Sequence, residues 1–194
     1  MMMKRNKPLL IQFAIMTKLN QCGAPRLTSS RENGWLSDIM KCLLIGYGNI
    51  GRGDDGLGPV IAQQITESEV LSNIDLKVCS LFQLDVALCD DLKSVDLAIF
   101  VDARDDDSDE KVIVRKEVVN PREIKASHSS HTCSINGLLN ITNNLYGTMP
   151  ECFAVLPKAY DFSFKEGLSS GANENAKLAS EKIVEIIREY SSKA

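Results

Sequence analysis

Short apolar runs alternate along this chain with longer segments whose apolar residues recur at helical spacing. The run Leu97–Val101 is apolar throughout, which is typical of a strand buried on both faces of a parallel sheet. From Ala176 to Tyr190, apolar residues lie three or four positions apart, which predicts one face of a helix. The pattern predicts strands near residues 41–46, 75–81, 97–102, 111–118 and 152–156, and helices near 57–68, 84–93, 134–147 and over the C-terminal segment.

Strands that alternate with helices in this way predict a three-layer α/β/α sandwich around a mostly parallel, twisted sheet of five or six strands. Residues 111–118 alternate with period two, which favours an edge strand. Ser134 is a typical helix cap and Gly147 a typical helix stop. Pro59 is expected at the first position of the first helix, where its missing N–H is not needed.

The first 39 residues differ from the rest. They begin with basic residues and carry a short apolar patch, Leu9–Met16, which are two ingredients of a secretory signal. Gln12 interrupts the patch, and no convincing cleavage site follows it. The alternatives are a loosely packed extension and a translation start at Met40. We interpret residues 1–39 as an extension outside the core, and residues 40–194 as one α/β domain.

Composition narrows the classes of partner. A net charge of −4 and a pI near 5.3 give no general attraction to nucleic acid. The six cysteines show no C-x-x-C spacing, which favours reduced thiols over a disulfide framework or a cysteine zinc site. No apolar run approaches the roughly 20 residues that a membrane span needs. We therefore expect a cytoplasmic monomer with no nucleic-acid or membrane partner.

A glycine-rich loop follows the first strand and matches G-x-G-x-x-G, which makes Gly46, Gly48 and Asn49 candidate cofactor-binding residues. Taken alone, the loop predicts an NAD-type oxidoreductase. Asp54 and Asp55 argue against this, because two carboxylates at the helix mouth would repel a pyrophosphate. The second strand also ends without the acid that would hold the ribose.

Polar groups follow three of the predicted elements at the same edge of the sheet. Asp55, with Asp54, lies after the first strand, and Asp102 follows the third. His128 and His131 lie in the loop before the helix that begins near Ser134. Carboxylates and an imidazole on one rim could hold a divalent cation or act as acid–base groups.

Each of these residues also has a structural alternative. Asp54 and Asp55 could complement a helix N-terminus, and Asp102 could accept backbone N–H bonds. A histidine in a polar loop could simply be solvated. The acidic run Asp105–Glu110 lacks the glycine at the sixth position of an EF-hand loop, so we interpret it as a solvated turn.

These motifs together carry a family resemblance. They are Gly46-x-Gly48-Asn49, Asp54-Asp55-Gly56-x-Gly58, Phe100-Val101-Asp102-Ala103, and Ser130-His131 ahead of an apolar helix. In this combination the chain resembles the hydrogenase maturation endopeptidases, which process the large subunit of nickel–iron hydrogenases. The resemblance extends through Gln83-Leu84, Pro150–Phe153 and Phe162–Ser169, and thus covers most of the chain after residue 39.

The resemblance implies a hydrolase whose metal-binding and catalytic residues are Asp55, Asp102 and His131. It implies that the metal is nickel, supplied by the precursor of the hydrogenase large subunit, from which a C-terminal peptide is removed. Some members carry an aspartate and glycines after the second strand, where this chain has residues 79–82, so the precursor specificity stays open. The alternatives are the NAD-type oxidoreductase and a non-catalytic nickel-binding maturation factor.

Overall fold

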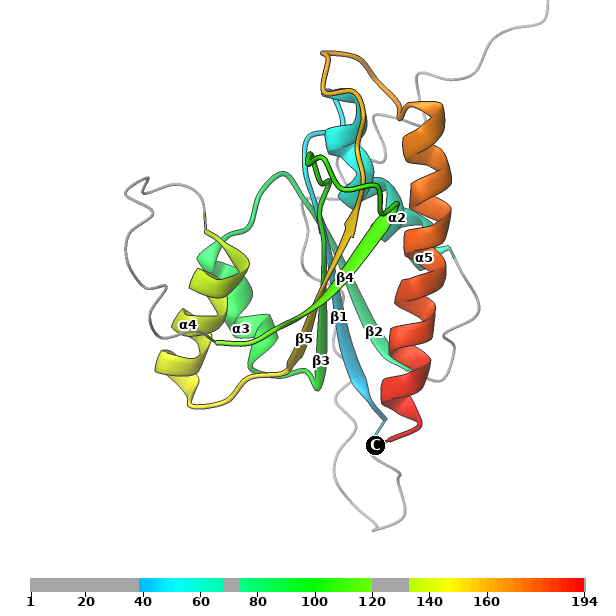
Figure 1. Cartoon of the computed structure of the whole chain (residues 1–194). Helices are drawn as coiled ribbons and strands as arrows, with labels where there is room; N and C mark the ends of the chain where they lie inside the picture. The colour runs from blue at the N-terminus through cyan, green and yellow to red at the C-terminus, as the bar shows by residue number, and fades with distance from the viewer. Residues whose placement is uncertain (1–38, 68–73, 120–132, 194) are drawn as a thin grey trace, which may run out of the picture. The chain divides into compact units, whose positions relative to one another are not determined.

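The computed structural model describes residues 39–67, 74–119 and 133–193. In this part of the chain, five strands form one sheet in the order β2-β1-β3-β5-β4 (Figure 1). The strands are β1 (Lys41–Tyr47), β2 (Asp75–Leu81), β3 (Leu97–Val101), β4 (Val112–Glu117) and β5 (Glu151–Pro157). All neighbouring pairs are parallel except β4 and β5, so the mostly parallel sheet and the edge strand are confirmed.

Helices cover both faces of this sheet. They are η1 (Gly53–Gly56), α2 (Leu57–Thr66), η3 (Val86–Leu88), α3 (Cys89–Leu92), α4 (Ile135–Tyr146) and α5 (Ser170–Ser191). Figure 1 shows α2 and α5 on one side of the sheet, and α3 and α4 on the other. The predicted three-layer α/β/α sandwich is therefore confirmed for the described residues.

The central strands β1 and β3 are apolar throughout because each side of the sheet packs against its own core. Leu44 and Ile99 belong to the core cluster that includes residues of α2 and α5. Leu43 and Phe100, one position away, belong to the cluster that includes residues of α3 and α4. All four side chains are fully buried. A strand that faces a helix layer on both sides has no position left for a polar side chain.

Helix α4 has the ends that the sequence predicts. The Ser134 side chain accepts a hydrogen bond from the backbone N–H of Gly137, and Gly147 is left-handed at φ 66°. The first helix differs slightly from its prediction, because α2 begins at Leu57 and Pro59 is its third residue. That position is still in the first turn, where a backbone N–H has no helical partner.

The predicted helix over residues 84–93 is wrong in its length. Asp85 has an extended backbone, and its side chain accepts a hydrogen bond from the N–H of Ala87. This cap starts a single 3-10 turn, which leads into the four-residue helix α3. The predicted apolar face is nevertheless real, since Leu84, Leu88 and Leu92 are all buried in the same cluster.

Two further predictions concern the surface and the N-terminal extension. The acidic run is an exposed turn, in which Asp106 accepts hydrogen bonds from Arg104 and from the N–H of Ser108.

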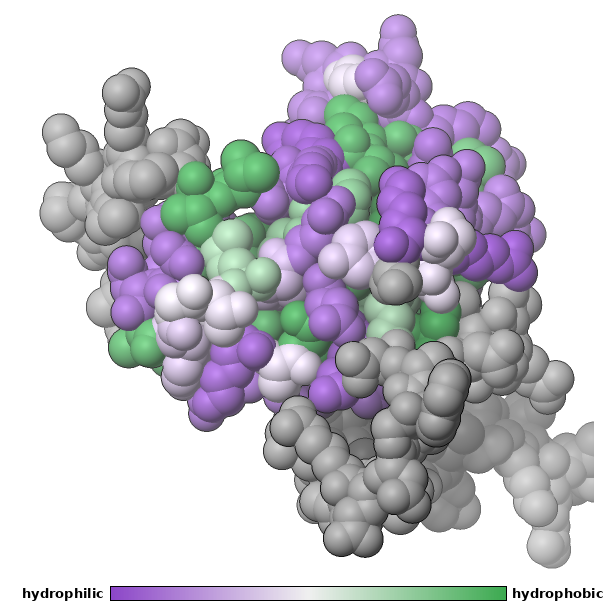
Figure 2. Space-filling view, turned by 90° about the horizontal axis from the view of Figure 1, so that it is seen from below, coloured by the Kyte–Doolittle hydropathy of each residue, from purple (hydrophilic) through white to green (hydrophobic). Residues whose placement is uncertain are grey.

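Figure 2 shows the face at the amino ends of the strands, where hydrophilic and hydrophobic residues are intermixed. Residues 1–38 lie outside the described residues, so the predicted extension stays a prediction. None of the described helices is long and apolar enough to cross a membrane.

Candidate functional site

The strand order reverses next to β1, because β2 pairs with one edge of β1 and β3 with the other. The connection that leaves the carboxyl end of β1 therefore leads through α2 to β2, whereas the connection that leaves β3 leads in the other direction along the sheet, to β4. In open α/β sheets, such a reversal leaves a crevice at the carboxyl edge where ligands bind. Asp55 follows β1 and Asp102 follows β3, so the topology brings both predicted carboxylates to this crevice.

The glycines after β1 allow the loop to fold back closely onto η1 and α2. A Cβ on Gly46 would lie 2.1 Å from the carbonyl oxygen of Gly58. A Cβ on Gly48, which has φ +139°, would lie 2.0 Å from the carbonyl oxygen of Asp55. Close backbone packing thus accounts for these glycines without a bound pyrophosphate, and their predicted cofactor contact stays a prediction.

Asn49, the third predicted cofactor-binding residue, makes two hydrogen bonds within the loop, and its predicted cofactor contact also stays a prediction. Its backbone N–H donates to Oδ2 of Asp55 at 3.1 Å. Its side-chain oxygen accepts the N–H of Gly51 at 2.9 Å. Both bonds shape the loop and hold one oxygen of the Asp55 carboxylate at a defined place.

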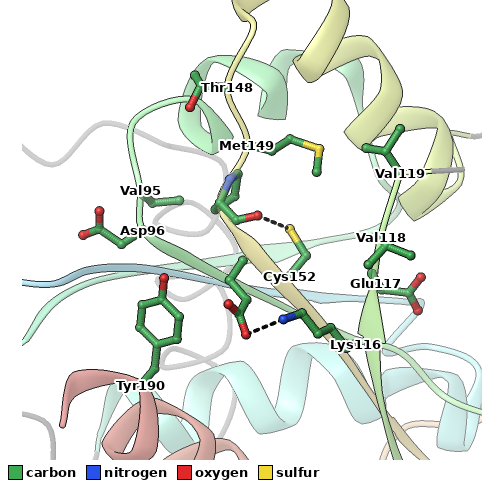
Figure 3. Close-up of a pocket in the computed structure, with 12 residues that line it drawn as sticks. Val95, Asp96, Lys116, Glu117, Val118, Val119, Thr148, Met149, Cys152 and Tyr190 are labelled. Atoms are coloured by element: carbon green, nitrogen blue, oxygen red, sulfur yellow. Dashed lines mark hydrogen bonds and ion pairs between the residues drawn. The ribbon is translucent and has the colours of Figure 1, made fainter. Parts of the chain in front are cut away.

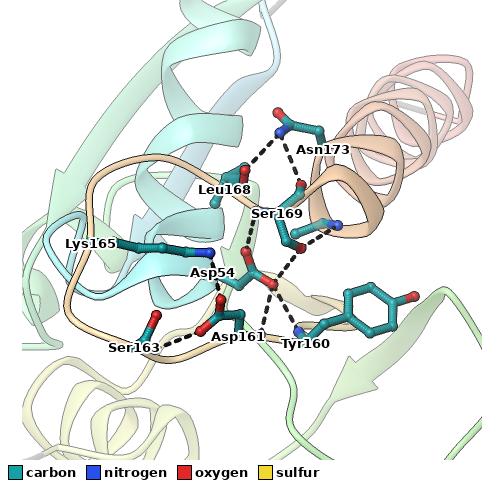
Figure 4. Close-up of polar contacts among 9 residues, drawn as sticks. Asp54, Tyr160, Asp161, Ser163, Lys165, Leu168, Ser169 and Asn173 are labelled. Carbon is teal, nitrogen blue, oxygen red and sulfur yellow. Dashed lines mark hydrogen bonds and ion pairs between the residues drawn. The ribbon is translucent and has the colours of Figure 1, made fainter.

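Asp54 has a structural role, although not the predicted alternative of complementing the N-terminus of the helix that follows it. Its side chain is fully buried and accepts hydrogen bonds from the N–H groups of Tyr160, Asp161 and Ser169 and from the Ser169 hydroxyl (Figure 4). Burial alone would raise the pKa of Asp54, but these bonds outweigh it and lower the pKa below its ordinary value. Asp54 therefore ties η1 to the loop between β5 and α5.

Asp55 and Asp102 line one pocket at the crevice. The other lining residues come from the ends of β1 and β2 and from the start of the α4 segment: Tyr47, Gly48, Asn49, Arg52, Phe82, Gln83, Leu84 and Cys133. Both carboxylates are half-buried, in contrast to the fully buried Asp54. The structure thus separates two adjacent aspartates into one that holds the fold and one that faces a pocket.

The environment of Asp102 favours its protonated form. Burial raises the pKa of Asp102 to about 6, and the negative charge of Asp55 adds to this effect. Hydrogen bonds from the Tyr47 hydroxyl and from the N–H of Ala103 act in the opposite direction. A bound cation would offset the repulsion between the Asp55 charge and an ionised Asp102. The pair would supply two carboxylate ligands to a divalent metal.

The histidines cannot be added to this geometry, because His128 and His131 lie outside the described residues. Among the residues that the structure does describe, no three His, Cys, Asp or Glu side chains converge as a metal site. Cys133 lines the pocket, but burial raises the pKa of its thiol, so it is protonated at neutral pH and is no activated nucleophile.

A second pocket opens near the amino ends of β3 and β5 (Figure 3). Lys116 forms an ion pair with Glu151 at 2.9 Å across its floor. Cys152 is buried, which raises the pKa of its thiol to about 12. Lys116 is paired, Cys152 is protonated, and none of the predicted site residues lines this pocket, so the carboxyl-edge pocket is the candidate site.

Sequence reasoning did not find Tyr47, because the pairing of β1 with β3 cannot be read from the sequence. Tyr47 follows Gly46, which is paired with Val101, the residue before Asp102. Knowledge of the β1–β3 register would have placed the tyrosine beside the aspartate. The role of Asp54 was missed for a similar reason, because its partners lie more than 100 residues further along the chain.

No protein-family model matches the sequence, and no curated protein matches it. Solved structures do share its fold. The hydrogenase maturating endopeptidase HybD from Escherichia coli is 18% identical, with a TM-score of 0.62, and the match covers 78% of this chain and 94% of that one. The NiFe hydrogenase maturation protease HycI from Thermococcus kodakarensis KOD1 is 19% identical, with a TM-score of 0.58, over 78% of this chain and 95% of that one.

A third similar structure is the hydrogenase 2 maturation peptidase from a Thaumarchaeota archaeon, which is 19% identical with a TM-score of 0.53. That match covers 76% of this chain and 97% of the other. This chain therefore has the fold of the hydrogenase maturation proteases, as its motifs predict.

Proposed function

We propose that this protein is an endopeptidase that removes a C-terminal peptide from the nickel-loaded large-subunit precursor of a nickel–iron hydrogenase. One observation carries the proposal: Asp55 and Asp102 line the same pocket at the strand-order reversal of a maturation-protease fold. The motif set around these residues gives independent support, because it includes the histidine of the predicted ligand set.

Nickel enters this reaction as part of the substrate. Carboxylate oxygens of Asp55 and Asp102 and the imidazole of His131 would complete the coordination of a nickel whose other ligands are thiolates of the precursor. A precursor without nickel lacks that contact and binds more weakly. Recognition of the metal thus makes cleavage follow metal insertion.

The chemistry is hydrolysis of one peptide bond. A metal held in this pocket would polarise a carbonyl or acidify a water molecule. Asp102 lines the pocket, so the oxygen of its carboxylate that does not hold the metal would accept a proton from the attacking water and return it to the leaving amine. Asp55 accepts the N–H of Asn49 and would offer its remaining lone pairs to the metal.

The direct test is incubation of the purified full chain with a nickel-loaded large-subunit precursor from the same organism. We expect mass spectrometry to detect a released C-terminal peptide, and we expect the nickel-free precursor to stay intact. His131→Ala should abolish cleavage, whereas the matched variant His128→Ala should keep most of it. Equal losses in the two variants would contradict the choice of His131.

The same assay separates the two alternatives. A non-catalytic nickel-binding factor would bind the loaded precursor and release no peptide. An NAD-type oxidoreductase would bind NAD tightly and would be indifferent to nickel. Either result would overturn the endopeptidase proposal.

A further inference from the structure

The two most exposed large apolar side chains of the described residues are phenylalanines in loops at the carboxyl edge of the sheet. Phe164 is 88% exposed and Phe82 is 68% exposed. Phe82 follows β2 directly and lines the carboxyl-edge pocket, and Phe164 lies in the loop between β5 and α5. Ile50, in the glycine-rich loop after β1, is exposed as well. Exposed aromatic side chains contribute little to the stability of a fold, but they are enriched where proteins bind each other.

The turn that carries Phe164 has a defined shape. The Asp161 carboxylate accepts the backbone N–H of Ser163 at 2.8 Å and the Lys165 ammonium at 2.5 Å (Figure 4). Both chain neighbours of Phe164 are therefore bonded to one residue, while the phenyl side chain stays exposed. An ordered turn presents this side chain to a partner at low entropic cost, because little backbone freedom remains to be lost on binding.

Hydrogen bonds join this turn to the loop that leads into the pocket. Three consecutive residues donate to backbone carbonyl oxygens of the turn: Nε of Arg52 to Phe162 at 3.2 Å, the N–H of Gly53 to Lys165 at 2.9 Å, and the N–H of Asp54 to Asp161 at 2.8 Å. Asp55, the next residue, lines the pocket. A partner that contacts Phe164 is thus held at a defined place relative to the pocket.

Arg52 adds a positive charge between the two phenylalanines. It lines the pocket together with Phe82, and its guanidinium carbon lies 5.9 Å from the centroid of the Phe162 ring. Within the described part of the chain, no carboxylate forms an ion pair with Arg52. Its terminal nitrogens form a fork that binds a carboxylate through two parallel hydrogen bonds. A complementary partner surface is therefore apolar, with an acidic side chain opposite Arg52.

We propose that Ile50, Arg52, Phe82 and Phe164 form a docking surface for the folded body of the precursor, beside the segment that is cut. The inference rests on the proposed function, in which the pocket itself receives the metal and the scissile peptide. The docking surface is continuous with that pocket, because Arg52 and Phe82 belong to both. A second copy of this chain seated on the docking surface would cover the pocket and exclude the precursor, so we assign the surface to the precursor.

Steady-state kinetics of precursor cleavage by the full chain test the docking surface. Phe164→Ala should raise KM about 10-fold, because truncation of an aromatic side chain at the centre of an interface costs at least that much binding. kcat should stay near the wild-type value, because Phe164 does not line the pocket. The melting temperature should change little, since the side chain is exposed. Arg52→Gln should also raise KM, and it should make KM less dependent on salt concentration.

Leu145→Ala is the matched control. Leu145 is 63% exposed, but it lies in the last turn of α4, whose first turn follows Cys133 of the pocket. This variant loses an exposed apolar side chain outside the docking surface and should cleave the precursor with the wild-type KM.

The outcomes separate the docking surface from the proposed function. A wild-type KM in Phe164→Ala, or an equal rise in Leu145→Ala, would overturn the docking surface and leave the proposed function standing. A wild-type chain that is dimeric in light scattering, and that Phe164→Ala makes monomeric, would assign the surface to a second copy and also overturn the inference.

A wild-type chain that cleaves no precursor would overturn the proposed function first. Surface plasmon resonance with the nickel-loaded precursor then tests docking alone, and Phe164→Ala should bind about 10-fold more weakly while Leu145→Ala binds as the wild type does. Equal binding by all three proteins, or no binding by any of them, would overturn the docking surface.

Discussion

Asp54 and Asp55 are neighbours in the chain with opposite surroundings. Asp54 is buried and accepts three backbone N–H bonds and one hydroxyl bond. Asp55 is half-buried in the pocket wall and accepts one backbone N–H. The number of bonds that each carboxylate makes to the protein predicts what its removal does to the fold.

Asp54→Asn should destabilise the protein by about 2–4 kcal/mol, because the amide cannot satisfy all four donors. The lowered pKa of Asp54 means that its contribution is present above its ordinary value of 3.8 and is lost as the pH falls below it. Chemical denaturation of the wild type and of Asp54→Asn at pH 7 and at pH 3 measures the difference in their free energies of unfolding. A difference that does not shrink at the lower pH would contradict the charge-based explanation.

Asp55→Asn is the matched comparison. An asparagine oxygen can still accept the Asn49 N–H, so the metal-free protein should be no less stable than the wild type. Nickel and cadmium binding should weaken strongly, and precursor cleavage should stop. A destabilised Asp55→Asn protein with unaltered metal affinity would assign Asp55 a structural role and contradict the metal site.

Asp102 gives a pH-dependent prediction of opposite sign to that of Asp54. Its pKa is raised to about 6 in the folded protein, so the folded state holds this proton more tightly than the unfolded state does. Ionisation of Asp102 therefore lowers the stability of the metal-free protein as the pH rises from about 4 to about 6. Asp102→Asn should be more stable than the wild type at pH 7, by at most about 3 kcal/mol, and equal to it at pH 3. Thermal melts of both proteins between pH 3 and pH 7 show whether Asp102→Asn becomes the more stable protein as the pH rises.

At the scale of elements, local signals predicted most boundaries. The caps of α4 and the apolar runs of β1 and β3 depend on neighbouring residues only, and all three elements agree with their predictions. The helix predicted over residues 84–93 was too long, because leucine spacing reports burial and not backbone conformation. The Asp85 cap, which delays the helix, is a competing local bond.

Two glycines at element boundaries allow steric and conformational effects to be compared. A Cβ on Gly58, in the first turn of α2, would lie 2.3 Å from the Tyr47 carbonyl oxygen and 2.6 Å from that of Val101. Gly58→Ala should therefore push α2 away from β1 and β3, lower the melting temperature by many degrees and disturb metal binding.

Gly147→Ala is the control for this substitution. It has no atom within 4 Å of the added Cβ, but it requires a left-handed backbone at φ +66°. Gly147→Ala should lower the free energy of unfolding by only about 1 kcal/mol and leave the metal affinity unchanged. Similar effects for the two variants would show that steric contact between the strand ends and α2 does not position the pocket.

At the scale of the whole molecule, the site depends on strand order, which no local signal encodes. The alternation of strands and helices predicts that Asp55 and Asp102 share an edge of the sheet. Only the pairing of β1 with β3 makes them neighbours, and the same pairing brings Tyr47 to Asp102. The long-range bonds of Asp54 were beyond prediction for the same reason.

The last prediction concerns the chain before the sheet. Residues from Met40 onward supply all five described strands, both helical layers and the carboxylate pair, and Met40 itself is buried. Deletion of residues 1–39 should therefore preserve a cooperative thermal transition, cadmium affinity and precursor cleavage. Calorimetry on the truncated and full chains measures the thermal transition and the cadmium affinity, and size-exclusion chromatography detects aggregation. A truncated protein that aggregates or loses metal affinity would mean that the apolar patch Leu9–Met16 packs on the domain, and the domain boundary would then lie before Met40.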